Sequence, residues 1–345
     1  MSGQGSKRVA VVAGDGIGPE VVESALEVLT AAGVHLDLVR LEVGLGRWKR
    51  TGEALGDEDL DTIKQCDCIL FGAITTPPDP GYRSVLLRLR RALDLYANIR
   101  PFQSSDLDFI IVRENTEGLY SGREEVGEEE SRTTRVITRR GSERIAEAAC
   151  DLAAKRRLLT IIHKSNVLKS DWLFLQTCRE VAERRGIPCE DMLVDAAAYN
   201  LVTNPRKFDV MVTTNLFGDI LSDEAAGVIG SLGLCASANI GESHALFEPI
   251  HGSAPDIAGK GIANPIGAIR SAAMMMEWLG DARAAGRIEA AVRRALATGA
   301  RTPDLGGSCR TADVTGAVVG CLMAEQSEEP PVPEKDVQKR EMQFG

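Results

Sequence analysis

The chain has 345 residues, which is enough for two domains or for one large domain with a substantial core. Its net charge of −10 argues against general affinity for nucleic acid or for an anionic membrane, and no apolar run approaches the roughly 20 residues of a membrane span. The first eight residues lack a signal-peptide core, so we expect a cytoplasmic protein without a membrane or nucleic-acid partner.

The first segments alternate between strand-like and helical patterns. Residues 7–13 form a short apolar run of strand type, and a helix follows, with Pro19 at its first position and Gly33 at its stop. The glycine-rich turn between them, GDGIG at 14–18, is not the G-x-G-x-x-G of a dinucleotide-binding unit. By itself it indicates an ordinary tight turn. Residues 68–73 form a second buried strand, which leads into a proline-rich loop.

Arginines are dense in residues 82–101. A helix there would place Leu86, Leu89, Leu93 and Tyr96 on one face and most of the arginines elsewhere. Any single arginine could be a solvated helix charge. Together with Arg113, however, these guanidinium groups could clamp a substrate that carries several carboxylates.

The middle of the chain continues the alternation. A strand at 109–112 opens into the polar run 113–120, where α/β proteins often place binding groups. We also expect an exposed hairpin or loop at 122–131, a helix at 142–156 capped by Ser142, and a strand at 158–162 that leads into residues 163–166.

Two acids stand four residues apart after a strand at 208–212. If a helix covers 219–230, the carboxylates of Asp219 and Asp223 point from one face, where they repel each other unless a cation lies between them. Oxygen ligands would suit Mg²⁺ or Mn²⁺. The alternative is that Asp219 is an N-terminal helix acid and Asp223 a solvated surface residue. A third acid, Asp195, ends the apolar run 192–194.

The last third combines one irregular stretch with three helices. Residues 240–261 form a long loop rich in glycine and proline, which is usually functional in a compact domain. Helices are expected at 266–279, 282–298 and 311–324, and residues 326–345 have little apolar surface to bury.

Six segments, in this order, resemble the β-decarboxylating dehydrogenases, the family of isocitrate, 3-isopropylmalate, homoisocitrate and tartrate dehydrogenases: GDGIGPE at 14–20, LRRALDLYANIRP at 89–101, RENTEGLY at 113–120, HKSNVLK at 163–169, NLFGDILSD at 215–223 and FEPIHGSAPDIAGKGIANP at 247–265. The resemblance implies an α/β fold with two domains around a large mixed sheet and no true Rossmann unit. The first domain would comprise residues 1–95 and 230–330, and the second residues 96–229. From their composition, residues 331–345 are expected to be a mobile tail.

The resemblance also implies roles for individual residues. Arg90, Arg100 and Arg113 match the positions that bind the malate carboxylates. Asp219 and Asp223 match ligands of Mg²⁺ or Mn²⁺, completed by Asp195 of the partner subunit. Tyr120 and Lys164 match the acid/base pair, and Lys164 also comes from the partner, so the expected active site needs a homodimer; a tetramer remains open.

The cofactor is expected to be NAD. In this family an aspartate at the position of Asp256, followed here by Ile257, accepts from the ribose hydroxyls and would repel the 2′-phosphate of NADP. Further cofactor-binding residues implied by the resemblance are Ile17, Thr75, Asn166, Glu248, His251, Gly252, Ser253, Ala254 and Asn264.

In this family, the segment before Arg90 contacts the variable group of the substrate. The sequence keeps a leucine pair, Leu86 and Leu87, but has Arg83 where isopropylmalate enzymes carry a glutamate, and Ser84 matches isocitrate enzymes. This combination most resembles methanogen-type homoisocitrate dehydrogenases, with Arg83 on a distant carboxylate. The expected reaction is oxidative decarboxylation to a 2-oxo acid, CO₂ and NADH. Isocitrate and 3-isopropylmalate remain alternative substrates. A non-catalytic regulatory subunit is a further alternative, although all catalytic positions are present.

Overall fold

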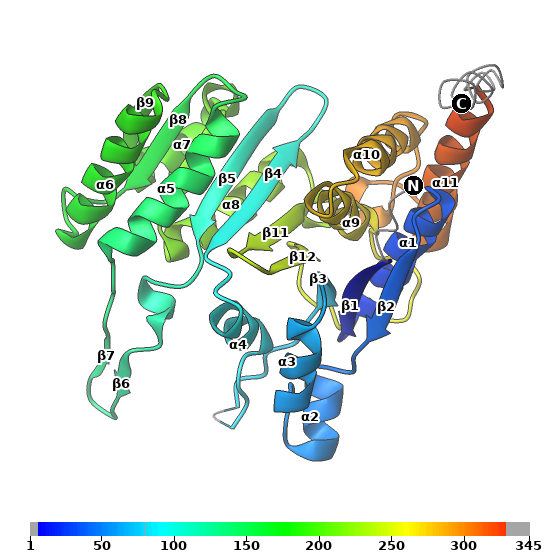
Figure 1. Ribbon diagram of the computed structural model, residues 1–345, viewed down its shortest axis with the longest axis horizontal. Coiled ribbons are helices and arrows are strands. Elements are labelled where there is room, and N and C mark those ends of the chain that lie inside the picture. Colours follow the sequence, from blue (N-terminus) through cyan, green and yellow to red (C-terminus); the bar gives the residue numbers. More distant parts are fainter. Residues whose placement is uncertain (1–5, 80, 329–345) are drawn as a thin grey trace, which may run out of the picture.

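A computed structural model describes residues 6–79 and 81–328. Its centre is one mixed sheet of ten strands, in the order β2-β1-β3-β12-β11-β4-β5-β10-β8-β9 (Figure 1). The strands are β1 Lys7–Gly14, β2 Leu36–Arg40, β3 Cys68–Ala73, β4 Ala97–Gln103, β5 Asp108–Glu114, β8 Leu159–His163, β9 Cys189–Leu193, β10 Val210–Thr213, β11 Ala236–Ile240 and β12 Ala245–Pro249. A separate hairpin pairs β6 Glu124–Val126 with β7 Ser131–Thr133.

The two ends of the sheet are parallel and its middle is antiparallel. Strands β2, β1, β3 and β12 are parallel to one another, and so are β5, β10, β8 and β9. Between these two groups, the pairs β12–β11, β11–β4 and β4–β5 are antiparallel. This α/β architecture with a large mixed sheet confirms the predicted fold class. It differs from a Rossmann fold, whose sheet is mostly parallel.

Helices cover both faces of the sheet. They are α1 Gly18–Ala31, α2 Leu45–Thr51, α3 Asp57–Lys64, α4 Val85–Ala92, α5 Arg139–Ala153, α6 Ser170–Arg185, α7 Val194–Thr203, α8 Asn215–Ile229, α9 Ile266–Trp278, α10 Ala282–Ala297 and α11 Thr311–Glu328. Short 3₁₀ turns lie at Leu119–Ser121, Pro205–Lys207, Leu232–Leu234 and Pro303–Leu305. None of the helices within the described ranges is long and apolar enough to cross a membrane.

The central strand β4 separates two environments. Side chains alternate along a strand, so Asn98 and Arg100 point to one face and Ile99 to the other. On β5, Ile99 is paired with Val112, and both residues pack in the apolar cluster under α5. On β11, Ile99 is paired with Ala238, which belongs to the apolar cluster under α9. Helices α5 and α9 therefore share one face of the sheet (Figure 1), and Asn98 and Arg100 of β4 lie on the other.

Most predicted elements are confirmed, but the boundaries of two helices were wrong. The helix expected over residues 82–101 covers only Val85–Ala92, because the backbone turns at Asp94, with φ of 46°, and continues as β4. Tyr96 is therefore not on the helix. Helix α8 begins four residues earlier than predicted, at Asn215. Asp219 consequently lies in its second turn and is not an N-terminal helix acid.

Two further predictions need correction. Helix α5 is capped by Thr138, whose hydroxyl accepts from the amide of Gly141 at 2.9 Å, while the predicted cap Ser142 is buried inside the helix and donates back to the carbonyl of Thr138. The stretch 240–261 is not wholly a loop, since it contains β12. Its alternation was hidden because every residue of that central strand is buried.

The strand order separates the chain as the predicted domains would. Strands from residues 1–95 and 230–330 form the half β2-β1-β3-β12-β11, and strands from residues 96–229 form the half β4-β5-β10-β8-β9. The sheet itself is continuous across this seam, and the division into two domains stays a prediction. The predicted tail, residues 331–345, lies outside the described residues.

Candidate active site

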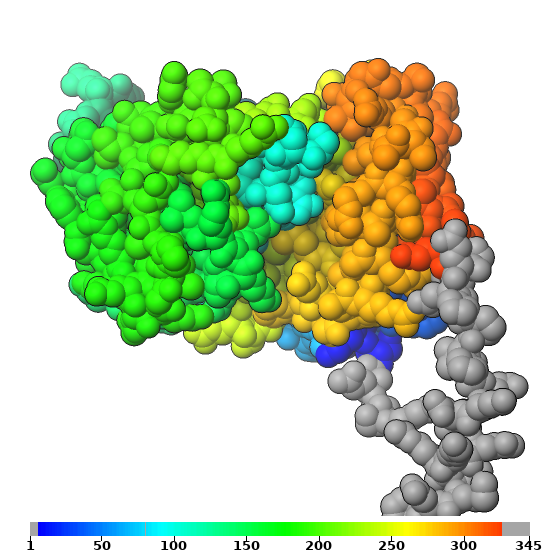
Figure 2. Space-filling view, turned by 90° about the horizontal axis from the view of Figure 1, so that it is seen from above, coloured from blue at the N-terminus to red at the C-terminus, as the bar shows by residue number. Residues whose placement is uncertain are grey.

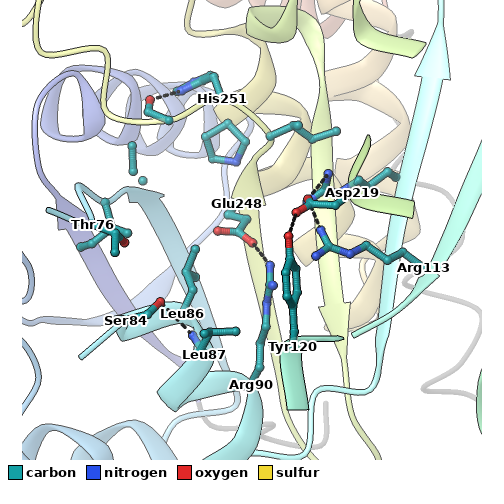
Figure 3. A pocket seen from close by; sticks show the side chains of 17 residues that line it. Thr76, Ser84, Leu86, Leu87, Arg90, Arg113, Tyr120, Asp219, Glu248 and His251 are labelled. Carbon is teal, nitrogen blue, oxygen red and sulfur yellow. Dashed lines mark hydrogen bonds and ion pairs between the residues drawn. The ribbon is translucent and has the colours of Figure 1, made fainter. Parts of the chain in front are cut away.

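Polar and charged side chains from both halves of the sheet meet around one cavity of about 400 Å³. Figure 3 shows Tyr120, Arg113 and Asp219 grouped on one side, Ser84, Leu86 and Leu87 on the other, and Arg90 between them. The predicted site residues that line this cavity are Ser84, Leu86, Leu87, Arg90, Arg100, Arg113, Tyr120, Asp219, Glu248, His251 and Gly252.

Three arginines reach the cavity from three different elements. Arg90 comes from α4, Arg100 from β4 and Arg113 from β5, and each is at least nine-tenths buried. Burial lowers the pKa of Arg113, and the neighbouring charges of Arg100 and Arg90 lower it further. Burial also lowers the pKa of Arg100. Three cations that converge in this way cost free energy unless an anion is bound among them.

Neutral oxygens hold two of these guanidinium groups in place. Arg100 donates from Nε to Oδ1 of Asn98 at 2.6 Å and from Nη1 to the hydroxyl of Ser222. Arg113 donates from Nε and Nη2 to Oδ1 of Asn215, at 3.1 and 2.8 Å. Because amides and hydroxyls carry no charge, they orient the arginines without neutralising them. The geometry suits a ligand with more than one carboxylate.

Tyr120 and Asp219 form the second part of the site. Tyr120 lies on the 3₁₀ turn Leu119–Ser121 and donates its hydroxyl to Oδ2 of Asp219 at 2.7 Å, while Arg113 binds the other carboxylate oxygen (Figure 3). Burial and the hydrogen bond to Asp219 raise the pKa of Tyr120. Burial alone would raise the pKa of Asp219, but the charge of Arg113 and the bond from Tyr120 outweigh it and lower that pKa. Asp219 is therefore an anion and Tyr120 a neutral proton donor.

The acid pair of α8 fits a hard divalent cation only in part. Asp219 and Asp223 lie one turn apart on the same helix, and both offer oxygen donors. Desolvation raises the pKa of Asp223, and the charge of Asp219 raises it too, against the opposing effect of Arg100. Within residues 6–79 and 81–328, however, no group of three His, Cys, Asp or Glu side chains is placed to hold a metal. One chain thus supplies two carboxylates of a possible site.

Lys164 and Asp195 do not line this cavity. They bind each other at 2.6 Å, Lys164 from the loop after β8 and Asp195 from the first turn of α7. The hydrogen bond from Lys164 lowers the pKa of Asp195. The loop is fixed by Asp171, a fully buried carboxylate that accepts from the amide of Lys164 at 2.7 Å. Asn166, predicted at the cofactor, is exposed on this same loop.

The first glycine-rich turn packs against the loop after β12. The amide of Ile17 donates to the carbonyl of Ser253 at 2.9 Å, and the Ser253 hydroxyl lies 2.6 Å from that of Thr75. A Cβ on Gly16, at φ of 59°, would lie 1.9 Å from the carbonyl oxygen of Ser253, so only glycine permits this approach. The predicted cofactor residues Ile17, Thr75 and Ser253 are therefore brought together.

The remaining predicted cofactor residues follow β12. Burial lowers the pKa of His251, and its Nε2 atom is buried without a hydrogen-bond partner among the described residues. Ala254 has the unusual φ of 38°, and Asp256 after it is exposed, as an acid that meets a ribose would need to be. Ile257 is half-buried beside it, and Asn264 donates to Asp304 at 3.0 Å. An imidazole nitrogen without a protein partner and an exposed carboxylate are groups to which a dinucleotide could hydrogen-bond.

The segment expected to contact the variable group of the substrate, residues 82–87, continues into helix α4, which begins at Val85. Ser84 caps the helix by accepting weakly from the amide of Leu87, at 3.4 Å, and Leu86 and Leu87 contribute apolar side chains to the cavity wall. Arg83 stands just before the cap, is exposed, and is not among the residues that line the cavity.

Sequence reasoning missed three asparagines and an aspartate. Asn98, Asn215 and Asn239 are wholly buried beside the arginines, and the Asp15 carboxylate accepts from the amides of Leu45 and Thr75, both at 3.0 Å. One signal was available: the triplet Ala-Asn-Ile occurs at 97–99 and again at 238–240. Asparagine is depleted in strands, so two such triplets in strand-like segments indicate buried amides that make specific hydrogen bonds.

The chain matches the model of the isocitrate/isopropylmalate dehydrogenase family over residues 8–318. This chain belongs to that family. It is 46% identical to homoisocitrate dehydrogenase of Methanocaldococcus jannaschii, over 91% of this chain and 97% of the relative, and 48% identical to 3-isopropylmalate/3-methylmalate dehydrogenase of the same organism, over 90% and 97%. Among solved structures, isocitrate dehydrogenase from Methylococcus capsulatus has a TM-score of 0.88 and 46% identity, covering 92% of this chain and 99% of that one.

Membership confirms the predicted resemblance and class of enzyme: an oxidoreductase that decarboxylates a small-molecule substrate. Members of the family generally use a nicotinamide cofactor and a divalent metal and are commonly oligomeric. The names of these relatives contain four different substrates, so membership alone leaves the substrate open.

Proposed function

We propose that this chain catalyses the NAD-dependent oxidative decarboxylation of a 3-substituted (R)-malate, with homoisocitrate as the substrate and Mg²⁺ or Mn²⁺ as the metal. The observation that carries the proposal is the convergence of Arg90, Arg100 and Arg113 beside the Tyr120–Asp219 hydrogen bond in one cavity. Three guanidinium groups match the carboxylates of such a substrate, and the tyrosine supplies a proton where the carbon skeleton would lie.

The reaction divides between protein groups and bound cofactors. When bound, NAD⁺ would supply a hydride acceptor for the secondary alcohol. Asp219 and Asp223, together with Asp195 of the partner subunit, would hold the divalent ion, which would supply Lewis acidity. Lys164 of the partner subunit removes the hydroxyl proton. The carboxylate β to the ketone then leaves as CO₂, and the Tyr120 hydroxyl returns a proton to the enol carbon.

A homodimer is part of the proposal. Lys164 and Asp195 lie outside the cavity of their own chain, in the part of the sequence that also carries much of the exposed apolar surface. Six of the ten exposed large hydrophobic side chains within the described ranges lie between residues 126 and 220: Val126, Val167, Trp172, Tyr199, Val202 and Ile220. The last three lie on α7 and α8, which pack together. Exposed apolar surface of this kind marks a protein interface, and a second copy would bring its own Lys164 and Asp195 there.

The choice of NAD is supported by charge. Asp256 is exposed on the loop beside His251, and a carboxylate at the ribose would accept from two hydroxyls but repel a phosphate. His251 and Glu248 line the same cavity as the arginines, so the cofactor loop borders the substrate pocket directly.

The choice of homoisocitrate is supported by Arg83, Leu86 and Leu87. The leucines provide an apolar wall for methylene groups, and burial of each methylene contributes about 0.8 kcal/mol. Arg83 is exposed and directly precedes the lining residue Ser84, so its guanidinium is the candidate partner of a distant carboxylate. The relative named homoisocitrate dehydrogenase agrees with this choice, and those named for 3-isopropylmalate and isocitrate define the alternatives.

The test is the kcat/KM of purified protein for homoisocitrate, isocitrate and 3-isopropylmalate. We expect homoisocitrate to be preferred. Arg83→Gln should lower its kcat/KM roughly 10-fold or more, the value of a charge-assisted hydrogen bond, and should spare 3-isopropylmalate, which lacks the distant carboxylate. Arg140→Gln, at an exposed arginine of α5, is the matched control. A clear preference for 3-isopropylmalate would refute the substrate, and inactivity of the chain expressed alone would favour a regulatory subunit.

A further inference from the structure

Two of the cavity arginines are joined by an unbroken line of buried side chains. Arg100 Nε donates to Asn98 Oδ1 at 2.6 Å, and Asn98 Nδ2 donates to Asn239 Oδ1 at 2.8 Å. Asn239 Nδ2 then donates to Glu248 Oε1 at 2.8 Å, and the same oxygen lies 3.5 Å from Nη2 of Arg90. Both asparagines have zero exposure, so no solvent competes for these bonds.

The direction of each amide in this line is fixed. Asn239 Oδ1 also accepts from Asn115 at 2.9 Å, and Asn98 Nδ2 also donates to the hydroxyl of Ser237 at 2.9 Å. If the Asn98 amide were rotated by half a turn, its NH₂ group would face Nε of Arg100, donor against donor. A rotated Asn239 would face Asn98 and Asn115 in the same unfavourable way. The line therefore has one orientation, with its acceptor end on Arg100 and its donor end on Glu248.

The line also crosses the seam of the sheet. Asn98 on β4 and Asn239 on β11 are directly paired in the antiparallel register. At this pair the half of the sheet with Arg100 and Arg113 meets the half with Glu248 and β3. The separation of Arg100 and Arg90 thus depends on two amides at the seam, and not on either half alone.

Neutral amides suit this place for an electrostatic reason. Three arginines and two acids, Asp219 and Glu248, line the cavity, which leaves an excess of one positive charge to attract an anion. An aspartate at position 98 could hold Arg100 equally well, but it would cancel that excess at close range.

We propose that Asn98 and Asn239 are positioning residues that hold Arg100 directly, and Arg90 through Glu248, at the separation that two carboxylates of one substrate require. Neither asparagine lines the cavity, so both act through the arginines. The inference rests on the proposed function in that it takes the malate part of the substrate as the ligand.

The test is a double-mutant cycle between Asn98→Ala and Arg100→Lys, read as kcat/KM for the preferred substrate. Alone, Asn98→Ala should reduce kcat/KM by roughly 10- to 100-fold, mainly through KM, with KM for NAD unchanged. In the Arg100→Lys background it should cost almost nothing further, because its effect passes through that arginine. Thr315→Val, which removes a buried hydroxyl bond of 2.9 Å on α11, controls for a general loss of packing.

Losses that simply multiply in the double variant would overturn the proposal, as would an Asn98→Ala enzyme no worse than Thr315→Val. If Asn98→Ala does not fold, Asn98→Ser gives the same comparison. A wild-type chain that oxidises none of the three malates would refute the proposed function. The positioning role would then be decided by the crystal structure of the Asn98 variant: a displaced Arg100 guanidinium supports it, and an unmoved one contradicts it.

Discussion

Removal of the Tyr120 hydroxyl should separate catalysis from binding in this site. In Tyr120→Phe the ring should keep its place, because it packs 5.5 Å from the guanidinium carbon of Arg113. The change removes only the proton donor and its 2.7 Å bond to Asp219. Asp219 keeps Arg113 as a partner, so it is not left as an unpaired buried charge.

The expected sizes follow from these contacts. A general acid contributes roughly 10²- to 10⁴-fold to a rate, so kcat should fall by that factor. Substrate KM should change less than about threefold, because the three arginines are untouched. The lost hydrogen bond is half-exposed and contributes about 1 kcal/mol, so Tm should fall by only a few degrees.

The assay is steady-state formation of NADH and of the 2-oxo acid, with Tm measured in parallel. Tyr96→Phe is a matched control, because it deletes the same atom from a ring that also packs on a guanidinium, that of Arg144 at 4.4 Å, outside the cavity. A Tyr120→Phe enzyme with kcat within about threefold of wild type would show that another group protonates the product. Raised KM with unchanged kcat would make Tyr120 a binding residue instead.

Three other outcomes test separate parts of the structure. Asp256→Arg should shift the ratio of kcat/KM for NAD over NADP toward NADP by at least roughly 10-fold, since a cation replaces the acid that would repel the phosphate; an unchanged ratio would remove Asp256 from cofactor selection. Val202→Asp, at an exposed apolar position of α7, should convert the dimer into inactive monomers, with the molar mass measured by light scattering. An active monomer would exclude an active site that is shared between two chains. Burial raises the pKa of Glu289 in α10, so the folded state binds this proton more tightly than the unfolded chain. The stability of wild type relative to Glu289→Gln should therefore fall as the pH rises from the unfolded-state pKa of about 4.3 through the raised pKa of the folded state. A Tm difference between the two proteins that does not vary with pH would contradict this.

The amino-acid sequence by itself determined the family, the class of reaction and most of the elements. Local patterns sufficed for α1 and α10, which each have one periodic apolar face, and for β1 and β3, which are short apolar runs with clear turn residues at their ends. Local patterns failed where the tertiary structure overrode them. Strand β12 is buried along its whole length, and the chain after α4 turns into β4 through a strained residue, Asp94. Neither feature leaves a periodic signal.

Only the tertiary structure decided how the site residues meet. Arg90, Arg100 and Arg113 were recognised from the sequence, but the asparagines that orient them were not. The repeated Ala-Asn-Ile triplet shows what it does only when β4 and β11 are known to pair, because that pairing brings Asn98 and Asn239 together. The pairing of Lys164 with Asp195, away from the arginines of the same chain, likewise follows from the folding of β8 and α7 side by side. Residue identity fixes which chemistry is available, and the register of β4 against β11 fixes the distance at which that chemistry acts.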